Sequence, residues 1–279
     1  MGKIAASPAS RVIAQGAGWT VSDVVCTSGP RDRPFEEQHV RFSIAIVTAG
    51  SFQYRSASGR ALMAPGSILL GNYGQSFECG HEHGVGDRCI AFRFAPERFE
   101  RIAAGAGARA LEFGVPRLPA MRETSCVIAQ ACAARAGASI SWEELAIQAA
   151  ARVIQIAAGL QPIQRHAPPS AEARVTRSVR YIERHPLAEM NLTSLAREAG
   201  LSPYHFLRTF QRLTGVTPHR FILRNRLREA ALRLASRPDR VLDIALDCGF
   251  GDVSNFNHAF RAEFGMTPVA YRKLYLAIL

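Results

Sequence analysis

GLSPYHFLRTFQRLTGVTP, residues 200–218, returns about 50 residues later as GFGDVSNFNHAFRAEFGMTP, residues 249–268. The two copies share their phenylalanines, their closing glycine and a final Thr-Pro pair. Aligned positions include Phe206 with Phe256, Phe210 with Phe260, and Gly215 with Gly265. A repeat of this length that occurs only twice indicates a duplicated supersecondary unit and not a solenoid.

Each copy has the pattern of two helices joined by a tight turn. In the first copy Asn191 and Ser202 are good helix N-caps, and Pro203 suits a first helical position. Phenylalanines at helical spacing then mark a buried face, and a glycine free to adopt positive φ closes the helix. The sequence therefore predicts two helix-turn-helix motifs with a connecting helix. The expected helices are 192–199, 203–214, 218–235, 241–248 and 252–264.

The repeated segment resembles the DNA-binding domain of the AraC/XylS family of bacterial transcription regulators. The residues that carry the resemblance are LAREAGLSPYHFLRTFQRLTGVTPHRFILRNRLREA and DIALDCGFGDVSNFNHAFRAEFGMTPVAYRK. It implies a sequence-specific regulator, not an enzyme, that binds double-stranded promoter DNA through two recognition helices. It further implies contact with RNA polymerase and a homodimer. The outward-facing polar residues are not those of any one member, so the resemblance gives no operator sequence.

The outward faces of the two expected recognition helices follow from the buried phenylalanines. Arginine pairs with guanine and asparagine with adenine, so Arg208, Asn255 and Asn257 suit base edges. Arg212 and Arg261 lie a turn later and suit phosphates. In the resembled family the matching positions contact DNA. The complete set of expected DNA-binding residues is Tyr204, His205, Leu207, Arg208, Arg212, Ser254, Asn255, Asn257, His258 and Arg261.

The chain is long enough for two domains and is strongly basic. It has 279 residues and a net charge of +11. From Ser170 onward it holds 17 Arg and Lys against 10 Asp and Glu, an excess that fits a surface for phosphates. We expect a sensor domain over 1–160 with a helical dimerisation segment, a proline-rich linker over 161–173, and the DNA-binding domain over 174–279.

The N-terminal part is predicted to be a β-barrel or sandwich, which makes the whole an α+β chain of two domains. Short β-rich runs alternate with Gly, Pro and Asn turns. The Pro65-Gly66 turn resembles that of the cupin-like sensor domain of AraC-type regulators. Expected strands lie within 19–21, 39–48, 51–56, 61–63, 67–70 and 89–94. A helical pair follows, over 119–135 and from Ser141 to Gly159, which packs against its own barrel or forms a dimer.

The stretch ECGHEHGVGDRC, residues 78–89, gathers potential metal ligands. Two thiols and two imidazoles suit zinc or another transition metal, and alternate residues of an extended segment share a face. Cys26 and His39, in other strands, could reach the same site. A redox pair of Cys79 with Cys89 and an ordinary polar loop remain the alternatives. The expected metal ligands are Cys79, His81, His83 and Cys89.

Three functions compete at this point. A regulator that senses a small molecule or a metal explains the duplicated motif. A metal-dependent cupin enzyme does not, and Phe77 stands where the cupin pattern places a histidine. A DNA-repair methyl acceptor needs a four-cysteine zinc centre. No signal peptide or membrane span is visible, so the sequence predicts a soluble protein of the bacterial cytoplasm, associated with the nucleoid, with reduced cysteines.

Overall fold

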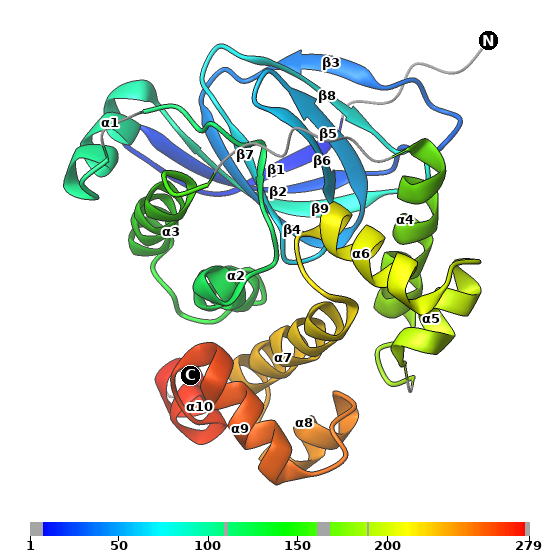
Figure 1. Ribbon diagram of the computed structural model, residues 1–279. Coiled ribbons are helices and arrows are strands. Elements are labelled where there is room, and N and C mark those ends of the chain that lie inside the picture. The colour runs from blue at the N-terminus through cyan, green and yellow to red at the C-terminus, as the bar shows by residue number, and fades with distance from the viewer. Residues whose placement is uncertain (1–7, 109–110, 161–167, 189, 277–279) are drawn as a thin grey trace.

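A β-domain of two sheets precedes a helical domain in the computed structural model (Figure 1). The structure describes residues 8–108, 111–160, 168–188 and 190–276. The strands are β1 (Ala9–Gly16), β2 (Trp19–Cys26), β3 (Phe35–Gln38), β4 (Phe42–Gly50), β5 (Phe52–Ser56), β6 (Gly59–Met63), β7 (Ile68–Gly71), β8 (Ser76–Gly80), β9 (Asp87–Phe94) and β10 (Arg117–Leu118).

Ten helices are found in this described part of the chain. They are α1 (Pro96–Gly105), α2 (Arg122–Arg135), α3 (Trp142–Ala157), α4 (Pro169–Arg184), α5 (Leu192–Glu198), α6 (Pro203–Thr214), α7 (Pro218–Ser236), α8 (Val241–Asp247), α9 (Val253–Phe264) and α10 (Pro268–Leu276). None of these helices combines the length and the apolar character that crossing a membrane requires.

The sheets have the strand orders β1-β2-β9-β4-β7-β10 and β3-β8-β5-β6, and every pairing is antiparallel. The strands β4, β7 and β9 at the centre of the larger sheet are mostly buried on both faces. On β4, Ile44 and Ile46 join the core that helices α1, α2 and α3 cover, while Ala45 and Val47 face the space between the sheets. This alternation is the period of two of a β-strand, and burial of both faces explains why most residues of β4 are apolar.

The sequence-based expectations for the strands were correct in place but incomplete. All six expected runs overlap strands, whereas β1, β3, β8 and β10 were not expected. His39 was assigned to a strand but lies in the loop before Phe42. The segment that was expected to be extended past Cys79 turns after Gly80. These elements are rich in polar residues, and partners distant in sequence determine their conformation.

The helical repeat is confirmed almost residue for residue. The side chains of Asn191, Ser202 and Thr217 cap α5, α6 and α7 by accepting backbone N–H bonds. Gly215 and Gly265 end the two recognition helices with φ of 82° and 76°, a left-handed conformation that favours glycine. The α+β two-domain fold with a double helix-turn-helix therefore forms as the sequence predicts.

The two domains are joined more closely than a linker over 161–173 predicts. Residues 161–167 lie outside the described residues, but 169–173 are the first turns of α4. Figure 1 shows α4 and α6 beside the sheets and α2 beside α7. Leu62 and Ala64 of the β-domain belong to the core of the first helix-turn-helix. Ala129 and Ala133 of α2 belong to the core of the second.

His39 is a buried residue in the interior between the two sheets. The Nε2 atom of His39 lies 2.8 Å from the hydroxyl of Tyr54, and the ring stacks on Phe77 at a centroid distance of 4.0 Å. Burial and the nearby charge of Arg93 lower the pKa of His39 to about 4. The imidazole is therefore neutral in the folded protein at any pH above this value.

We expect Phe260→Ala to destabilise the second helix-turn-helix by about 3–5 kcal/mol, the usual cost of removing a buried phenylalanine. Phe260 is fully buried and its ring contacts Phe256, Phe264 and Tyr271. Chemical denaturation followed by helical circular dichroism measures the loss. The exposed His258→Ala on the same helix is the control and should change stability by less than about 0.5 kcal/mol. Equal effects of the two substitutions would contradict the assigned core.

The low pKa of His39 makes the β-domain sensitive to acid. In the unfolded chain the imidazole binds a proton as the pH falls through about 6.5, whereas the folded chain resists this until about 4. Unfolding free energy should therefore fall by about 3 kcal/mol between pH 7 and pH 4 relative to His39→Asn. Trp19 and Trp142 lie in this part of the chain and report its unfolding by fluorescence. Parallel pH dependence in both proteins would refute the assignment.

Candidate DNA-binding face and ligand cavity

The outward face of α6 carries polar side chains around a shallow groove. Tyr204, His205, Arg208 and Arg212 line this groove and are exposed. The Nη1 atom of Arg208 lies 3.3 Å from the Tyr204 hydroxyl, and its guanidinium lies 5.7 Å from the centre of the tyrosine ring. Leu207 is only half-buried. All five residues expected on this helix therefore lie on its accessible side.

The outward face of α9 is built in the same way. Buried Phe256 and Phe260 fix the orientation of the helix, and the side chain of Asp252 caps its start by accepting the N–H of Asn255. The five residues expected on this face are all exposed, namely Ser254, Asn255, Asn257, His258 and Arg261. Both helices thus present imidazole and guanidinium groups to solvent, and α9 adds the amides of Asn255 and Asn257.

Not all of the basic excess of the helical domain is available to DNA. Arg224 donates from Nη1 to the carbonyl of Ala120 and forms a 2.8 Å ion pair with Glu263. Arg228 donates to the carbonyl of Pro65. Arg180 also points into the β-domain. These arginines were counted as phosphate-attracting charge from the sequence, and the structure assigns them to the contact between the domains.

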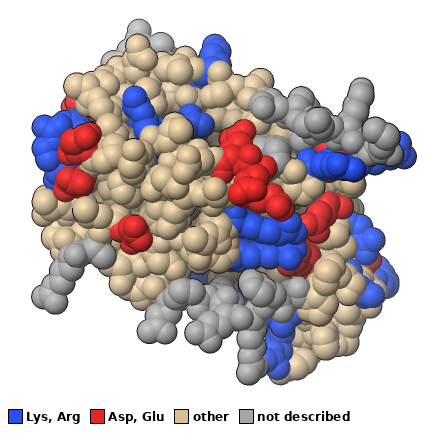
Figure 2. Space-filling view, turned by 90° about the horizontal axis from the view of Figure 1, so that it is seen from above, with Lys and Arg blue, Asp and Glu red and all other residues tan. Residues whose placement is uncertain are grey.

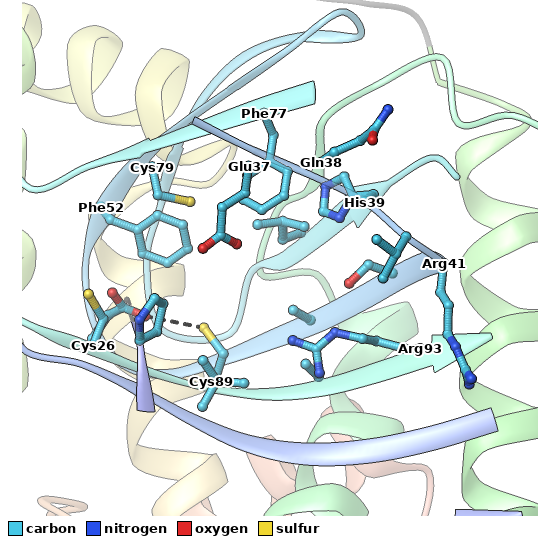
Figure 3. A pocket seen from close by; sticks show the side chains of 18 of the residues that line it. Cys26, Glu37, Gln38, His39, Arg41, Phe52, Phe77, Cys79, Cys89 and Arg93 are labelled. Atoms are coloured by element: carbon cyan, nitrogen blue, oxygen red, sulfur yellow. Dashed lines mark hydrogen bonds between the residues drawn. The ribbon is translucent and has the colours of Figure 1, made fainter. Parts of the chain in front are cut away.

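A cavity of about 280 Å³ lies between the two sheets. Its apolar walls come from both sheets and include Val24, Ala45, Phe52, Leu69, Phe77 and Ala91. Figure 3 shows its labelled side chains in two groups, with His39, Arg41 and Arg93 at one end and the three cysteines at the other. The wall therefore offers a basic end and a sulfur-rich end to a bound molecule.

Arg93 extends into the cavity from the basic end, whereas the carboxylate of Glu37 points toward Phe52 and Cys79 (Figure 3). Burial lowers the pKa of Arg93, while the negative charge of Glu37 acts in the opposite direction. Within the described residues the Arg93 guanidinium is affected by burial and by nearby charges, not by a side-chain hydrogen bond. A few charged groups in a mostly apolar wall are typical of a small-molecule pocket.

At the sulfur-rich end Cys26, His81 and Asp87 form a compact group. Cys26 and Asp87 are cross-strand neighbours of β2 and β9. The Nε2 atom of His81 lies 2.6 Å from Oδ1 of Asp87, and the ligand atoms of all three residues lie within 4.8 Å of one another. Cys89 donates from Sγ to Oδ2 of Asp87 at 3.4 Å.

The environment of this group favours charged side chains. Burial raises the pKa of the Cys26 thiol, but hydrogen bonds from His81 and Ser28 outweigh it and leave the pKa below its ordinary value. Burial lowers the pKa of His81, but its bonds to Asp87 and Cys26 raise it to about 9. Burial holds the pKa of Cys79 and of Cys89 well above normal, so these thiols stay neutral.

The four metal ligands expected from the sequence do not form a single group. His81 lies with Cys26 and Asp87, whereas His83 lies with Glu82 and Glu172. The chain turns after Gly80, so the regular alternation of an extended strand does not continue through His81 and His83. Cys26 was noted as a residue that could reach the site. Asp87 was missed, although it lies within the same stretch, two residues before Cys89.

Two family models match the chain. The AraC-like ligand binding domain covers residues 26–174, and a helix-turn-helix domain covers residues 195–274. The first includes all residues that line the cavity except Pro8 and Val24, and the second includes both recognition helices. Neither metal-capable group in the described part of the chain contains more than one cysteine, so the four-cysteine centre of a methyl acceptor is not formed there.

The curated relatives match between a third and two fifths of the chain. The probable transcriptional regulator LumQ of Photobacterium leiognathi is 36% identical over 92 residues, 33% of this chain and 37% of that protein. The transcriptional activator RhaS of Klebsiella pneumoniae is 35% identical over 108 residues, 39% of either chain. The chain thus spans less than two fifths of the length of these relatives.

Solved structures match different shares of the chain. The DNA-binding domain of AdpA in complex with a target DNA is 28% identical, with a TM-score of 0.37 over 38% of this chain and 95% of that chain. ToxT from Vibrio cholerae, bound to an unsaturated fatty acid, is 11% identical, with a TM-score of 0.38 over 95% of this chain and 98% of that chain. On the strength of the two family models, the chain belongs to the AraC family of transcriptional regulators, with a ligand-binding domain followed by a double helix-turn-helix domain.

Proposed function

We propose that this protein regulates transcription by placing α6 and α9 in neighbouring major grooves of promoter DNA. The observation that carries the proposal is the pair of exposed polar faces on two helices whose opposite faces are fixed by matching buried phenylalanines. Arg208, Asn255 and Asn257 read base edges, and Arg212 and Arg261 contact phosphates.

The spacing of the motifs supports this arrangement. The connecting helix α7 has 19 residues, which span about 28 Å at the usual helical rise. Successive major grooves on one side of a duplex repeat every 34 Å or so. A rigid connector of this length is of the right order to separate two recognition helices by one turn of DNA.

The charge pattern supports a separate face for DNA. Figure 2 shows one side of the molecule, on which acidic and basic side chains lie next to each other in mixed clusters. Such a surface has no strong attraction for a polyanion. The exposed residues of α6 and α9, in contrast, include arginines, histidines and asparagines but no carboxylate among the ten proposed contacts. Promoter binding places the protein in the bacterial cytoplasm, at the nucleoid.

The cavity is the proposed effector site. It lies in the domain that matches an AraC-like ligand-binding domain, and its wall joins the opposite charges of Glu37 and Arg93 to an apolar interior. Occupancy of this cavity alters the contacts that hold the helical domain and so changes DNA binding. The protein acts without catalysis, through contact with RNA polymerase.

The proposed homodimer requires a surface that the chain does not already use. Helices α2 and α3 bury their apolar faces against the β-domain, against each other and, for α2, against α7. Their outward faces remain, where Ile147 is 36% exposed. The apolar faces of α2 and α3 are already buried within the chain, so a second copy would bind at their outward faces or at another surface.

Arg208→Ala should weaken binding to the cognate site by about 1–3 kcal/mol, the usual value of a bidentate base contact. The site is first selected from random duplexes with the full-length protein, and affinities are then measured by fluorescence anisotropy at fixed salt. Binding to random DNA should change much less. Arg101→Ala on α1 removes the same charge from an exposed position distant from both motifs and serves as the control.

Equal losses on selected and random DNA would remove Arg208 from the base-reading set. Failure to select any duplex with the full-length protein would refute the proposed function itself.

A further inference from the structure

We propose that Cys26, His81 and Asp87 bind one zinc-type metal ion whose fourth coordination position opens into the cavity. A thiolate, an imidazole and a carboxylate are the side chains that zinc prefers. Their ligand atoms already lie within 4.8 Å of one another. All three residues line the cavity, so a fourth ligand, whether water or a donor atom of an effector, can approach from the interior.

The surroundings suit a metal site more than a simple polar cluster. The side chains of His81 and Asp87 are only 2% and 7% exposed, and Cys26 is 5% exposed. Cys89 donates to the second oxygen of Asp87, a contact that would orient the carboxylate toward the metal. Phe52 lies beside the ring of His81 at a centroid distance of 5.9 Å and covers it.

The neighbouring group of Glu82, His83 and Glu172 is a weaker candidate, although its ligand atoms are equally close. Glu172 is paired with Arg60, and Glu82 is paired with Arg55. These guanidinium groups already neutralise the carboxylates, and a cation would have to displace them. Asp87 has no guanidinium partner among the described residues. It is paired with the imidazole of His81, from which a metal ion has to displace only a proton.

The position of the site connects it to the helical domain. His81 and Asp87 stand at the two ends of the loop between β8 and β9. Within that loop the carbonyls of Val85 and Gly86 accept hydrogen bonds from Arg180 of α4, at 2.7 and 3.0 Å. His81 and Asp87 therefore belong to the cavity wall, while the two residues directly before Asp87 belong to the contact between the domains.

Metal binding would change the width of this loop at its base. Nε2 of His81 and Oδ1 of Asp87 are 2.6 Å apart, a hydrogen-bond distance. Two such ligands on one tetrahedral zinc ion lie roughly 3.3 Å apart, given metal-ligand bonds of about 2.0–2.1 Å. The ion replaces the proton shared by His81 and Asp87 and moves the two ends of the loop apart. This movement shifts the carbonyls of Val85 and Gly86, to which Arg180 donates. Metal occupancy is thus the regulatory signal that we infer for DNA binding.

The site is tested with Co²⁺ on the full-length, reduced, metal-free protein. One equivalent should give the ultraviolet charge-transfer band of a thiolate ligand together with visible bands, and Zn²⁺ should remove both. Cys26→Ser should lose the thiolate band, and Asp87→Asn should weaken binding by at least about tenfold. Cys126→Ser changes an exposed thiol on α2 and should match the parent protein.

Two results would overturn the site. One is the absence of a thiolate–cobalt band from the parent protein under reducing conditions. The other is an unchanged band in a Cys26→Ser protein whose near-ultraviolet circular dichroism shows it to be folded. Asp87→Asn keeps the size of the side chain and serves as a second test if Cys26→Ser does not fold. A disulfide of Cys26 that reductant must break before any metal binds would favour a redox pair and count against the metal site.

The regulatory step rests on the proposed function and is tested separately. Affinity for the selected duplex should differ by about 5–150-fold between Zn²⁺-loaded and metal-free protein, the usual range of coupling between two sites. Arg180→Ala should keep the cobalt spectrum and lose this difference. Equal affinity of both forms would refute the coupling while the cobalt bands still establish the site. If neither form binds any duplex, the proposed function fails and the metal result stands by itself.

Discussion

The arrangement of the two domains depends on burying arginine side chains against backbone carbonyls of the opposite domain. A guanidinium does not give up its charge, so it is buried only where several acceptors meet its N–H groups. Arg117 donates from one nitrogen to Leu62 of the β-domain and to Leu213 at the end of α6, at 2.6 and 2.7 Å. Burial lowers its pKa to about 10, which still leaves it charged at neutral pH. Arg117 lies in β10 of the β-domain, so separating the domains would remove its Leu213 acceptor.

The same constraint controls both recognition helices. Arg117 holds the end of α6, while Arg224 links α7 to Ala120 and, through Glu263, to α9. Breaking one partner of a buried charged contact is strongly unfavourable, because the remaining charge is left without compensation. The spacing of α6 and α9 is therefore not a property of the helical domain alone. It is fixed in part by the β-domain, which is where an effector would act.

The sequence was informative wherever structure is local. The caps at Asn191, Ser202 and Thr217, the glycine stops and the phenylalanine stripes depend on neighbours within a turn or two, and they formed as expected. The cavity group depends on the register between β2 and β9, which pairs Cys26 with Asp87 across 61 positions of sequence. No local pattern contains that register. His83 was expected as a ligand because residues 79–83 were treated as an extended segment, whereas the chain turns after Gly80.

The number of charged residues was a poor guide to the DNA-binding face, because it does not show which side chains are buried. A count of arginines does not distinguish an exposed Arg208 from an Arg180 whose guanidinium donates to Ser51, Val85 and Gly86. Through its hydrogen bonds, Arg180 of the helical domain ties the loop between β8 and β9 to α4. Strand β4 pairs with β9, and there Gly50 is the cross-strand neighbour of Asp87. The N–H of Gly50 donates to Glu183 of α4. Two hydrogen-bonded contacts to α4 thus converge on one end of the cavity. A change at Asp87 therefore has a short, direct route to the helical domain, whereas a change at the basic end must pass through the packed interior of the sheets.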